Sequence, residues 1–372
     1  MKKVFILHLL PLEYYPPITN LLDVLAEDKT IQTQVFSTHN NKQRKVYQDN
    51  NSLIYRGNYP AYAKGTFAKL SGYFSTLLKP LWYLIKFKPD SLLYIEPHSA
   101  LPAYLYKRFF NPNVKLCIHH HEYYAPEDFK APAMKSVRFF HKLETKYLFK
   151  KAAWISQTNI QRLNLLKSDL PFIKDEVLHT MANYPPLKWQ NRVQPKKSSK
   201  RIQLLYIGAL SFENTFIKDI VNFVNLNNDK LCFTIYAYNT QNDVREFLEK
   251  QDSKVIQYYP EGIAYEEIPK IASNYDIGLV LYKGHNLNYV FNAPNKLFEY
   301  LSCNLNVWFP KVMEGCKPYL NEGSRPTVKA LDFSNLSEKN ISAYEKTLNL
   351  PKRKIPYHCE NELQPLITVL KK

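Results

Sequence analysis

Short apolar runs alternate with longer amphipathic segments along most of the chain. Apolar runs of strand length bounded by turn residues predict β-strands, and apolar residues repeating every three or four positions predict helices. In the first half we expect strands at 4–9, 34–37, 92–95, 114–119 and 154–156, and helices at 17–26, 68–87, 100–110 and 133–150. In the second half we expect strands at 202–207, 231–236, 255–258, 277–282 and 305–309, and helices at 216–226, 244–250, 265–273, 294–302 and 360–370.

Strands that alternate with helices predict parallel sheets covered on both faces. The alternation stops in a stretch rich in proline, serine and charge, and it then restarts. A chain of 372 residues is also long for one domain. We therefore expect two Rossmann-like, doubly wound α/β domains with a cleft between them, at 1–185 and 201–350. The remaining residues would form a linker, 186–200, and a C-terminal helical segment, 351–372.

Neither of two apolar regions in the first domain favours a signal peptide or a membrane-spanning helix. The N-terminal apolar run is short, contains His8 and has no small-residue cleavage site after it, so a strand is preferred over a signal peptide. The longest apolar region, 76–87, is interrupted by Lys79, Pro80 and Lys86. It is too short and too charged to cross a bilayer, which needs about 20 apolar residues.

The net charge of +17 and the pI of about 9.4 favour anionic partners. Phosphorylated small molecules and an acidic membrane surface fit, and so does a basic surface that only aids solubility. Nucleic acid comes last, because the basic residues are spread along the chain and no zinc-finger, RNA-recognition or basic-zipper pattern is present. The five cysteines lack C-x-x-C spacing, which argues against a disulfide framework or a zinc site and fits the reducing cytoplasm.

The segment 293–301, sequence APNKLFEYL, carries the clearest chemical signal. Asn292 is suited to cap a helix that has Pro294 in its first turn. Lys296 and Glu299 lie three apart on one face, and the leucines form another face. A helix N-terminus and a lysine favour phosphate, and a carboxylate accepts two ribose hydroxyls, so the segment suits a nucleotide diphosphate. The alternative is an ordinary surface ion pair.

The stretch PNKLFEYLSCNLNVWF resembles the donor-site segment of GT-B glycosyltransferases, particularly glycosyltransferase family 4 and related bacterial surface-polysaccharide transferases. The preceding YDIGLVLY, 275–282, is similar to the strand before that segment. The resemblance implies that Glu299 binds the nucleotide ribose. We expect Glu299, Lys296, Asn295 and Gly208 to hold the nucleotide sugar, with Lys218 as a spare phosphate candidate and no cofactor beyond that substrate.

The chain also departs from the family pattern. Phe291 stands where members often have a glutamate that touches the donor sugar, and Asn304 and Asn306 replace a glycine and a proline. After Gly208 no basic residue appears until Lys218, where members usually place one earlier for the diphosphate. These departures leave open a non-standard donor or lost catalysis.

The stretch HHHEYY, 119–124, resembles the D-x-H-E-Y segment of related transferases. It implies catalytic roles for His121 at the sugar or leaving phosphate and for Glu122 at the acceptor. Neighbouring strand residues point to opposite faces, so we expect no metal site, although three adjacent histidines keep metal ligation and a structural role as alternatives. Glu13 and Tyr14 are weaker, exposed candidates near the acceptor, and 157–162 resembles the family's first domain loosely.

The resemblance implies a glycosyltransferase, retaining and independent of metal, that moves a sugar from a nucleotide sugar to a glycan or lipid-linked glycan, as in capsule or lipopolysaccharide synthesis. Basic and aromatic residues interleave at 62–88 and 135–151, which suits helices that lie on an anionic bilayer or simply pack a core with basic outer faces. We expect a cytoplasmic protein, peripheral at the inner face of the membrane. A GT-B-type nucleotide-sugar epimerase and a catalytically degenerate scaffold protein are the alternatives.

Overall fold

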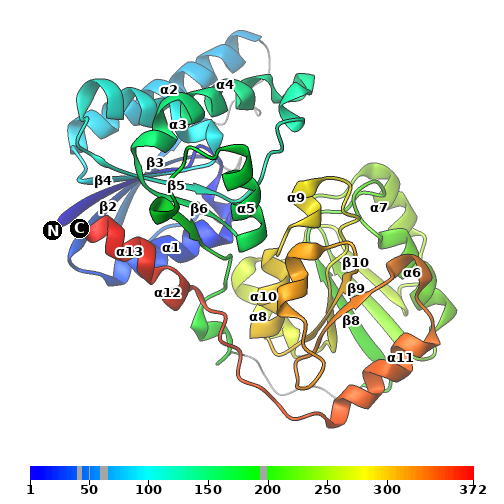
Figure 1. Cartoon of the computed structure of the whole chain (residues 1–372). Helices are drawn as coiled ribbons and strands as arrows, with labels where there is room; N and C mark the ends of the chain where they lie inside the picture. The colour runs from blue at the N-terminus through cyan, green and yellow to red at the C-terminus, as the bar shows by residue number, and fades with distance from the viewer. Residues whose placement is uncertain (40–43, 50, 59–65, 193–198) are drawn as a thin grey trace. The chain divides into compact units, whose positions relative to one another are not determined.

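The computed structural model describes residues 1–372 apart from 40–43, 50, 59–65 and 193–198, and it divides into two α/β units (Figure 1). The first unit is Met1–Ala182 with Cys359–Lys372, and the second is Asn183–His358. The described part of the expected linker lies in the second unit, where η10 (Leu187–Trp189) buries Trp189 in the core. The expected C-terminal segment is shared, because only the part from Cys359 joins the first unit.

The first unit is built on a seven-stranded sheet in the order β3-β2-β1-β4-β5-β6-β7, in which every neighbouring pair is parallel. Its strands are β1 (Lys2–Leu7), β2 (Ile31–Thr38), β3 (Ser52–Gly57), β4 (Ser91–Ile95), β5 (Lys115–His120), β6 (Ala152–Gln157) and β7 (Leu178–Thr180).

Helices cover both faces of this sheet. They are α1 (Pro16–Glu27), α2 (Thr66–Phe87), α3 (Ala100–Leu105), α4 (Lys135–Leu143), α5 (Ile160–Asp169), α12 (Cys359–Glu362) and α13 (Gln364–Lys371). Shorter turns include η1 (Leu12–Tyr14), η4 (Tyr106–Phe110), which continues α3 as a π-helix, and η7 (Glu144–Leu148), which continues α4.

Successive side chains of β1, in the middle of the sheet, point to opposite faces, which explains the two layers of the core. Val4 and Ile6 face α1, α12 and α13, whereas Phe5 and Leu7 face α2, α3 and α4. The C-terminal helix is tied to this unit by a hydrogen bond from Ser91 Oγ to the carbonyl of Leu370, at 2.9 Å. The returning end of the chain therefore completes one face of the first sheet.

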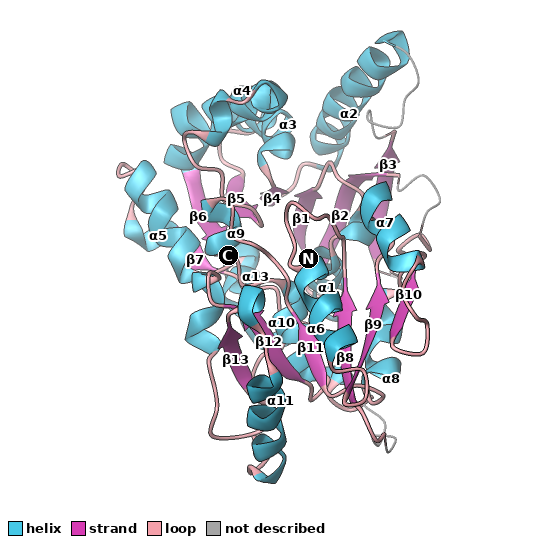
Figure 2. Cartoon of the chain, turned by 90° about the vertical axis from the view of Figure 1, so that its right-hand side faces the viewer, coloured by secondary structure: helices cyan, strands magenta, loops and turns pink. Residues whose placement is uncertain are grey.

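The second unit repeats the design on a six-stranded parallel sheet in the order β10-β9-β8-β11-β12-β13 (Figure 2). Its strands are β8 (Ile202–Ile207), β9 (Leu231–Tyr236), β10 (Ile256–Tyr259), β11 (Ile277–Leu279), β12 (Asn306–Pro310) and β13 (Val328–Leu331). Its helices are α6 (Ile217–Leu226), α7 (Asn242–Glu249), α8 (Ile268–Ala272), α9 (Leu287–Val290), α10 (Asn295–Ser302) and α11 (Glu338–Glu345).

Helix α10 packs unusually close to β11. A Cβ placed on Gly278 would lie only 2.2 Å from the Tyr300 ring, so glycine is required where the helix meets the strand. The Tyr300 hydroxyl accepts a hydrogen bond from the backbone N–H of Ile207, at 3.0 Å, which links α10 to the end of β8 as well. These contacts fix the position of the neighbouring Glu299.

The doubly wound α/β fold expected from the sequence is confirmed in both units. Details differ at α10, because Pro294 and not Asn292 is the N-cap residue, and at the C-terminus, where the expected single helix is divided into α12 and α13. Among the described residues, no helix combines the length and hydropathy needed to cross a membrane.

Candidate functional site

In the second sheet, β9 and β10 lie on the β8 side of the neighbouring pair β8 and β11, and β12 and β13 lie on the β11 side. The direction in which successive strands are added therefore reverses between β8 and β11. Ligands of doubly wound sheets bind beyond the carboxyl ends of the strands at such a switch point. Gly208 follows β8 directly, Tyr282 lies just after β11, and α10 begins at Asn295. The residues singled out in the sequence therefore come from the segments that surround this point.

Gly208 and Lys296 are brought together here, although they are far apart in the sequence. A Cβ on Gly208 would lie 2.5 Å from Lys296 Cε and 2.7 Å from its Nζ. Gly208 also has a φ of +146°, which L side chains rarely adopt. The glycine thus leaves room for the lysine to cross the end of β8.

The Lys296 ammonium lies among tyrosines. Its Nζ donates a hydrogen bond to Tyr282 Oη at 3.0 Å, and it lies 5.2 Å from the centroid of that ring and 5.6 Å from that of Tyr206. Tyr282 in turn stacks on Tyr289 of α9. Ring faces attract a cation without neutralising it, so the charge remains available for an anion.

Glu299 is 6% exposed and lies one turn further along α10. Burial raises the pKa of its carboxyl to about 7, against the opposing effect of the Lys296 charge. In the part of the chain that the structure describes, no ion pair joins the two residues. The arrangement therefore differs from an exposed ion pair on a helix surface, and its buried carboxyl is suited to accept hydroxyl hydrogen bonds.

The other expected donor-site residues lie in different surroundings. Asn295 is partly buried as the first residue of α10. Lys218 is exposed in the first turn of α6, and within the described residues no hydrogen bond or ion pair joins it to Gly208, Lys296 or Glu299. Sequence reasoning missed Lys283, whose Nζ donates to the carbonyl of Phe212 at 2.7 Å in the loop after Gly208.

In the first unit the HHHEYY stretch begins on β5 and continues past its carboxyl end, next to the switch point between β1 and β4. His119 and His121 point to one side, with 3.3 Å between His119 Nε2 and His121 Nδ1. His120 points to the other side. The expected separation of neighbouring histidines onto opposite faces is confirmed.

Glu96, which the sequence reasoning missed, holds this segment in place. Its Oε1 accepts hydrogen bonds from the backbone N–H groups of His121, at 2.6 Å, and Glu122, at 3.2 Å. Its Oε2 is buried without a hydrogen-bond partner in the described structure, and the residue has a φ of +65°. Burial raises the pKa of this carboxyl to about 7.

His8 adds a second buried polar group at the same end of the sheet. It follows β1, is fully buried, and neither ring nitrogen has a hydrogen-bond partner among the described residues. Burial lowers its pKa, and so does the nearby His121. Tyr15 packs edge-on against its ring, with 4.6 Å between centroids. Strain and unsatisfied buried polar atoms gather at functional sites. Their presence here makes this end of the first sheet a candidate functional site.

His120 belongs to a separate buried network. Its Nε2 lies 2.9 Å from Glu144 Oε1, which also accepts a 2.9 Å hydrogen bond from Tyr94 Oη, and His141 Nδ1 lies 3.1 Å from Glu144 Oε2. Burial alone would raise the pKa of Glu144, but the two histidines lower it to about 2. This network ties β5 to η7 and α4 and stabilises the fold.

Arg162 of α5 connects the loosely similar stretch 157–162 to the candidate segment. It is fully buried, donates from Nη1 to the carbonyl of His121, and places Nη2 3.7 Å from Glu122 Oε2. Glu122 itself is 47% exposed. The expectation of an exposed Glu13 is wrong, because its side chain is 3% exposed and forms an ion pair with Arg56 at 2.7 Å.

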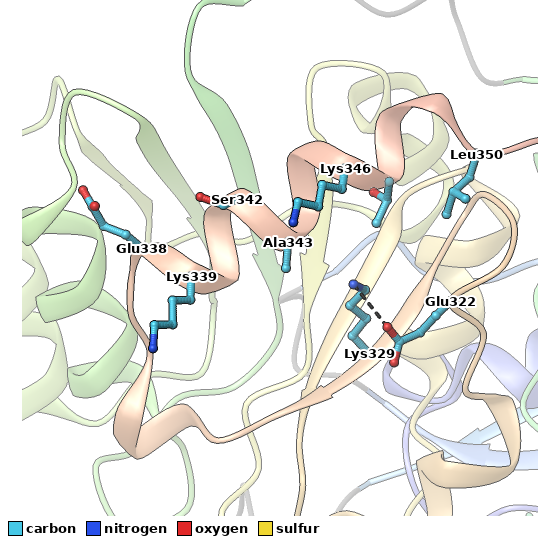
Figure 3. A pocket seen from close by; sticks show the side chains of 9 residues that line it. Glu322, Lys329, Glu338, Lys339, Ser342, Ala343, Lys346 and Leu350 are labelled. Atoms are coloured by element: carbon cyan, nitrogen blue, oxygen red, sulfur yellow. Dashed lines mark ion pairs between the residues drawn. The ribbon is translucent and has the colours of Figure 1, made fainter.

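A surface hollow elsewhere in the second unit contains none of the expected residues (Figure 3). It lies along α11 and β13, where Lys329 and Glu322 form an ion pair at 3.3 Å. Lys339, Ser342 and Lys346 line its other side. Its charges are those of an ordinary solvated surface.

The fold can be compared with known proteins, although no protein family and no curated protein sequence matches this chain. The UDP-GlcNAc 2-epimerase from Methanocaldococcus jannaschii is 16% identical with a TM-score of 0.60, over 100% of this chain and 99% of that one. The S. aureus MnaA in its UDP co-structure is 14% identical with a TM-score of 0.63, over 100% and 96%. The lipopolysaccharide outer core galactosyltransferase WaaB is 13% identical with a TM-score of 0.56, over 94% and 89%.

These similarities extend over both units, and the chain has a GT-B-type fold of two Rossmann-like α/β units. The fold class expected from the sequence is confirmed. The similar structures include epimerases and a transferase, so the fold is common to both kinds of enzyme.

Proposed function

We propose that this chain is a glycosyltransferase that moves a sugar from a nucleotide-sugar donor to a glycan or lipid-linked glycan. The observation that carries the proposal is the Lys296 ammonium held against Gly208 at the switch point of the second sheet, with the buried Glu299 one turn away. A cation beside a helix N-terminus suits a diphosphate, and a carboxyl suits ribose hydroxyls. The GT-B fold and the UDP bound in the S. aureus MnaA structure support the same ligand class.

In the proposed reaction the second unit holds the donor. Lys296 and the N-terminus of α10, which begins at Asn295, neutralise the charge that develops on the diphosphate as the glycosidic C–O bond breaks. Glu299 accepts hydrogen bonds from the ribose. The loop after Gly208, held by Lys283, borders the phosphates, and the exposed Lys218 is a further phosphate candidate.

In the first unit His121 and Glu122 are proposed to contact the reacting sugar and the acceptor. The new bond forms to the acceptor oxygen on the face that the leaving group vacates, so that configuration is retained. The acceptor proton passes to the departing phosphate oxygen, and no metal ion is needed for that transfer. Glu96 fixes the backbone of both residues and thereby positions them.

The proposed acceptor and the proposed cellular location rest on the resemblance to bacterial surface-polysaccharide transferases. We propose a cytoplasmic protein that works at the inner face of the membrane on a capsule or lipopolysaccharide glycan. The charge of +17 is consistent with a phosphorylated donor and an anionic lipid surface.

A nucleotide-sugar epimerase is the second candidate, and it is favoured by the similarity to UDP-GlcNAc 2-epimerases over the whole chain. Such an enzyme converts the nucleotide sugar without any acceptor. The fold and the proposed donor site serve both reactions equally well, so product analysis separates the two.

The deciding experiment incubates the protein with a panel of UDP-, GDP-, ADP-, CMP- and dTDP-sugars, with and without glycan and lipid-linked acceptors. We expect one donor to yield a glycosylated acceptor and free nucleotide, and Lys296→Met to reduce this turnover at least about 100-fold. An isomerised nucleotide sugar without acceptor would establish the epimerase instead. Nucleotide binding without any turnover would instead indicate a catalytically degenerate scaffold protein.

A further inference from the structure

Helix α2 exposes a stripe of large apolar side chains. Phe67 is 89% exposed, Phe74 67% and Trp82 55%, and Leu78 is exposed too. The four residues are separated by seven, four and four positions, which places them on one face of a helix. Figure 2 shows the N-terminal part of α2 reaching beyond the sheet that its other end covers. The stripe is therefore an outer face and not part of the core.

The neighbouring helices extend this apolar surface. Helix α2 packs on α3 and η4, and α3 packs on α4, so that they form one layer over the first sheet (Figure 1). η4 exposes Phe109 and Phe110, and α4 exposes Phe139. Isolated exposed apolar residues are common, but several large ones within one helical layer mark an interaction surface.

The same layer is strongly basic. Residues 71–88, 100–114 and 132–151 contain eleven lysines and arginines but a single acidic residue, Glu144, which is buried. Of the eleven, all but Lys107 are exposed. Lys86 lies 5.2 Å from the ring centroid of Trp82, and Arg108 lies 5.6 Å from that of Phe109. Basic and aromatic groups thus occupy one surface and touch each other.

We infer that this layer, formed by α2, α3, η4 and α4, is a docking surface for an anionic lipid bilayer. Aromatic side chains enter the headgroup region, while lysines and arginines bind the lipid phosphates and other anionic headgroups. The almost complete absence of acidic residues supplies the charge complementarity that selects this partner. The inference deepens the membrane location in the proposed function by naming the surface that binds the bilayer, and its tests do not depend on sugar transfer.

Trp82 reports on this surface without any mutation. The chain has four tryptophans, and Trp154, Trp189 and Trp308 are buried. Addition of phosphatidylcholine vesicles containing phosphatidylglycerol should therefore shift the emission of Trp82 to the blue, and brominated lipids should quench it. Phosphatidylcholine alone should have a much smaller effect. Trp82→Phe should remove the response while leaving sedimentation with the vesicles detectable.

Vesicle sedimentation tests the two kinds of contact separately. The charge variant Lys135→Ser/Arg138→Ser/Lys142→Ser should weaken binding at least about tenfold, because each surface cation adds to the attraction. The apolar variant Phe74→Ser/Trp82→Ser should weaken binding also at high salt, where charge is screened. Matched controls in the second unit are Lys250→Ser/Lys339→Ser/Lys346→Ser and Leu226→Ser, all exposed residues.

Several results would overturn the inference. One is equal binding to anionic and neutral vesicles, or none to either. Another is an equal loss of binding in the control variants, which would point to net charge alone. Binding of RNA that competes with vesicles and depends on the same lysines would assign the surface to nucleic acid, and formation of dimers through Trp82 would assign it to a second copy. Failure of sugar transfer leaves all these readouts unaffected.

Discussion

At the residue scale, two buried carboxyls distinguish the candidate sites, Glu299 in the second unit and Glu96 in the first. Burial raises the pKa of each to about 7. A carboxyl that keeps its proton near neutral pH donates as well as accepts hydrogen bonds. Both residues therefore suit hydroxyl-rich ligands better than an exposed, fully ionised glutamate would.

Glu96→Gln tests the environment of the first carboxyl. Between pH 4.5 and about 7 the native carboxyl keeps a proton that the unfolded chain releases, so the free energy of unfolding falls as pH rises through this window and is level above it. The glutamine variant lacks this effect. Its stability relative to the wild type should therefore rise by on the order of 3 kcal/mol from pH 4.5 to pH 8.

Urea unfolding at a series of pH values measures this difference. The exposed Glu127→Gln serves as the matched control and should leave the curve of the wild type unchanged. Parallel pH profiles of the wild type and Glu96→Gln would contradict a raised pKa at this position.

The sequence revealed some of these residues and hid others. Lys296 and Glu299 were singled out because their segment resembles the donor-site stretch of GT-B glycosyltransferases, whereas their spacing alone also fitted an ordinary surface ion pair. Glu96 and Glu144 were not, since their partners, His121 and His120, are 25 and 24 residues away in the sequence. The available signal for Glu96 was its place between an apolar strand and a proline. The burial of Glu13 was hidden as well, because its ion-pair partner Arg56 is distant in the sequence.

At the element scale, the approach of α10 to the ends of β8 and β11 determines the proposed donor site. The Gly208 φ of +146° and the nearby Lys296 leave no room for a side chain. Gly208→Ala should therefore push the flexible lysine aside and strain the end of β8 at a cost of about 1–3 kcal/mol. The fold should persist, while affinity for a nucleoside diphosphate falls at least about tenfold.

Isothermal titration with the nucleotide that stabilises the wild type measures this loss. Gly323→Ala is the matched control, because no atom lies within 4 Å of the added Cβ. Gly278→Ala should instead disrupt the fold, since its Cβ would meet the buried ring of Tyr300. Unchanged affinity in a folded Gly208→Ala protein would separate Gly208 from the ligand site.

Sequence periodicity located most of the elements and missed those with the weakest patterns. The unpredicted strands β3, β7 and β13 lie at sheet edges and are only partly buried, so they lack a continuous apolar run. The unpredicted helices α5, α9 and α11 are polar or short. Element boundaries at Pro294 and Leu363 depended on local backbone geometry that apolar spacing does not encode.

At the scale of the whole molecule, the chain builds two units and returns to the first with its last helices. Doubly wound folding of each half was predictable from the alternation of strands and helices. The return was not, because an amphipathic C-terminal helix contains no information about which sheet it will cover. Its apolar side chains, those of Cys359, Leu363, Leu366, Ile367 and Leu370, complete the core of the first unit next to α1.

Deletion of residues 359–372 should therefore unfold the first unit selectively. Each large apolar side chain removed from a core costs roughly 1.5–3 kcal/mol, and together they equal the usual stability of a domain. Calorimetry should show the loss of one cooperative transition while the second unit, which has its own core, retains its transition. Two intact transitions in the truncated protein would contradict this assignment.

The most direct test of the proposed donor site is a thermal-shift screen with UDP, GDP, ADP, CMP and dTDP on the wild type, Glu299→Ala and the control Glu246→Ala, whose glutamate is exposed. A ligand at 100 times its Kd stabilises the native state by about 2.7 kcal/mol. We predict that one nucleotide raises the melting temperature of the wild type and of Glu246→Ala but not that of Glu299→Ala. No shift with any nucleotide, or an equal shift in all three proteins, would contradict a nucleotide site at Lys296 and Glu299.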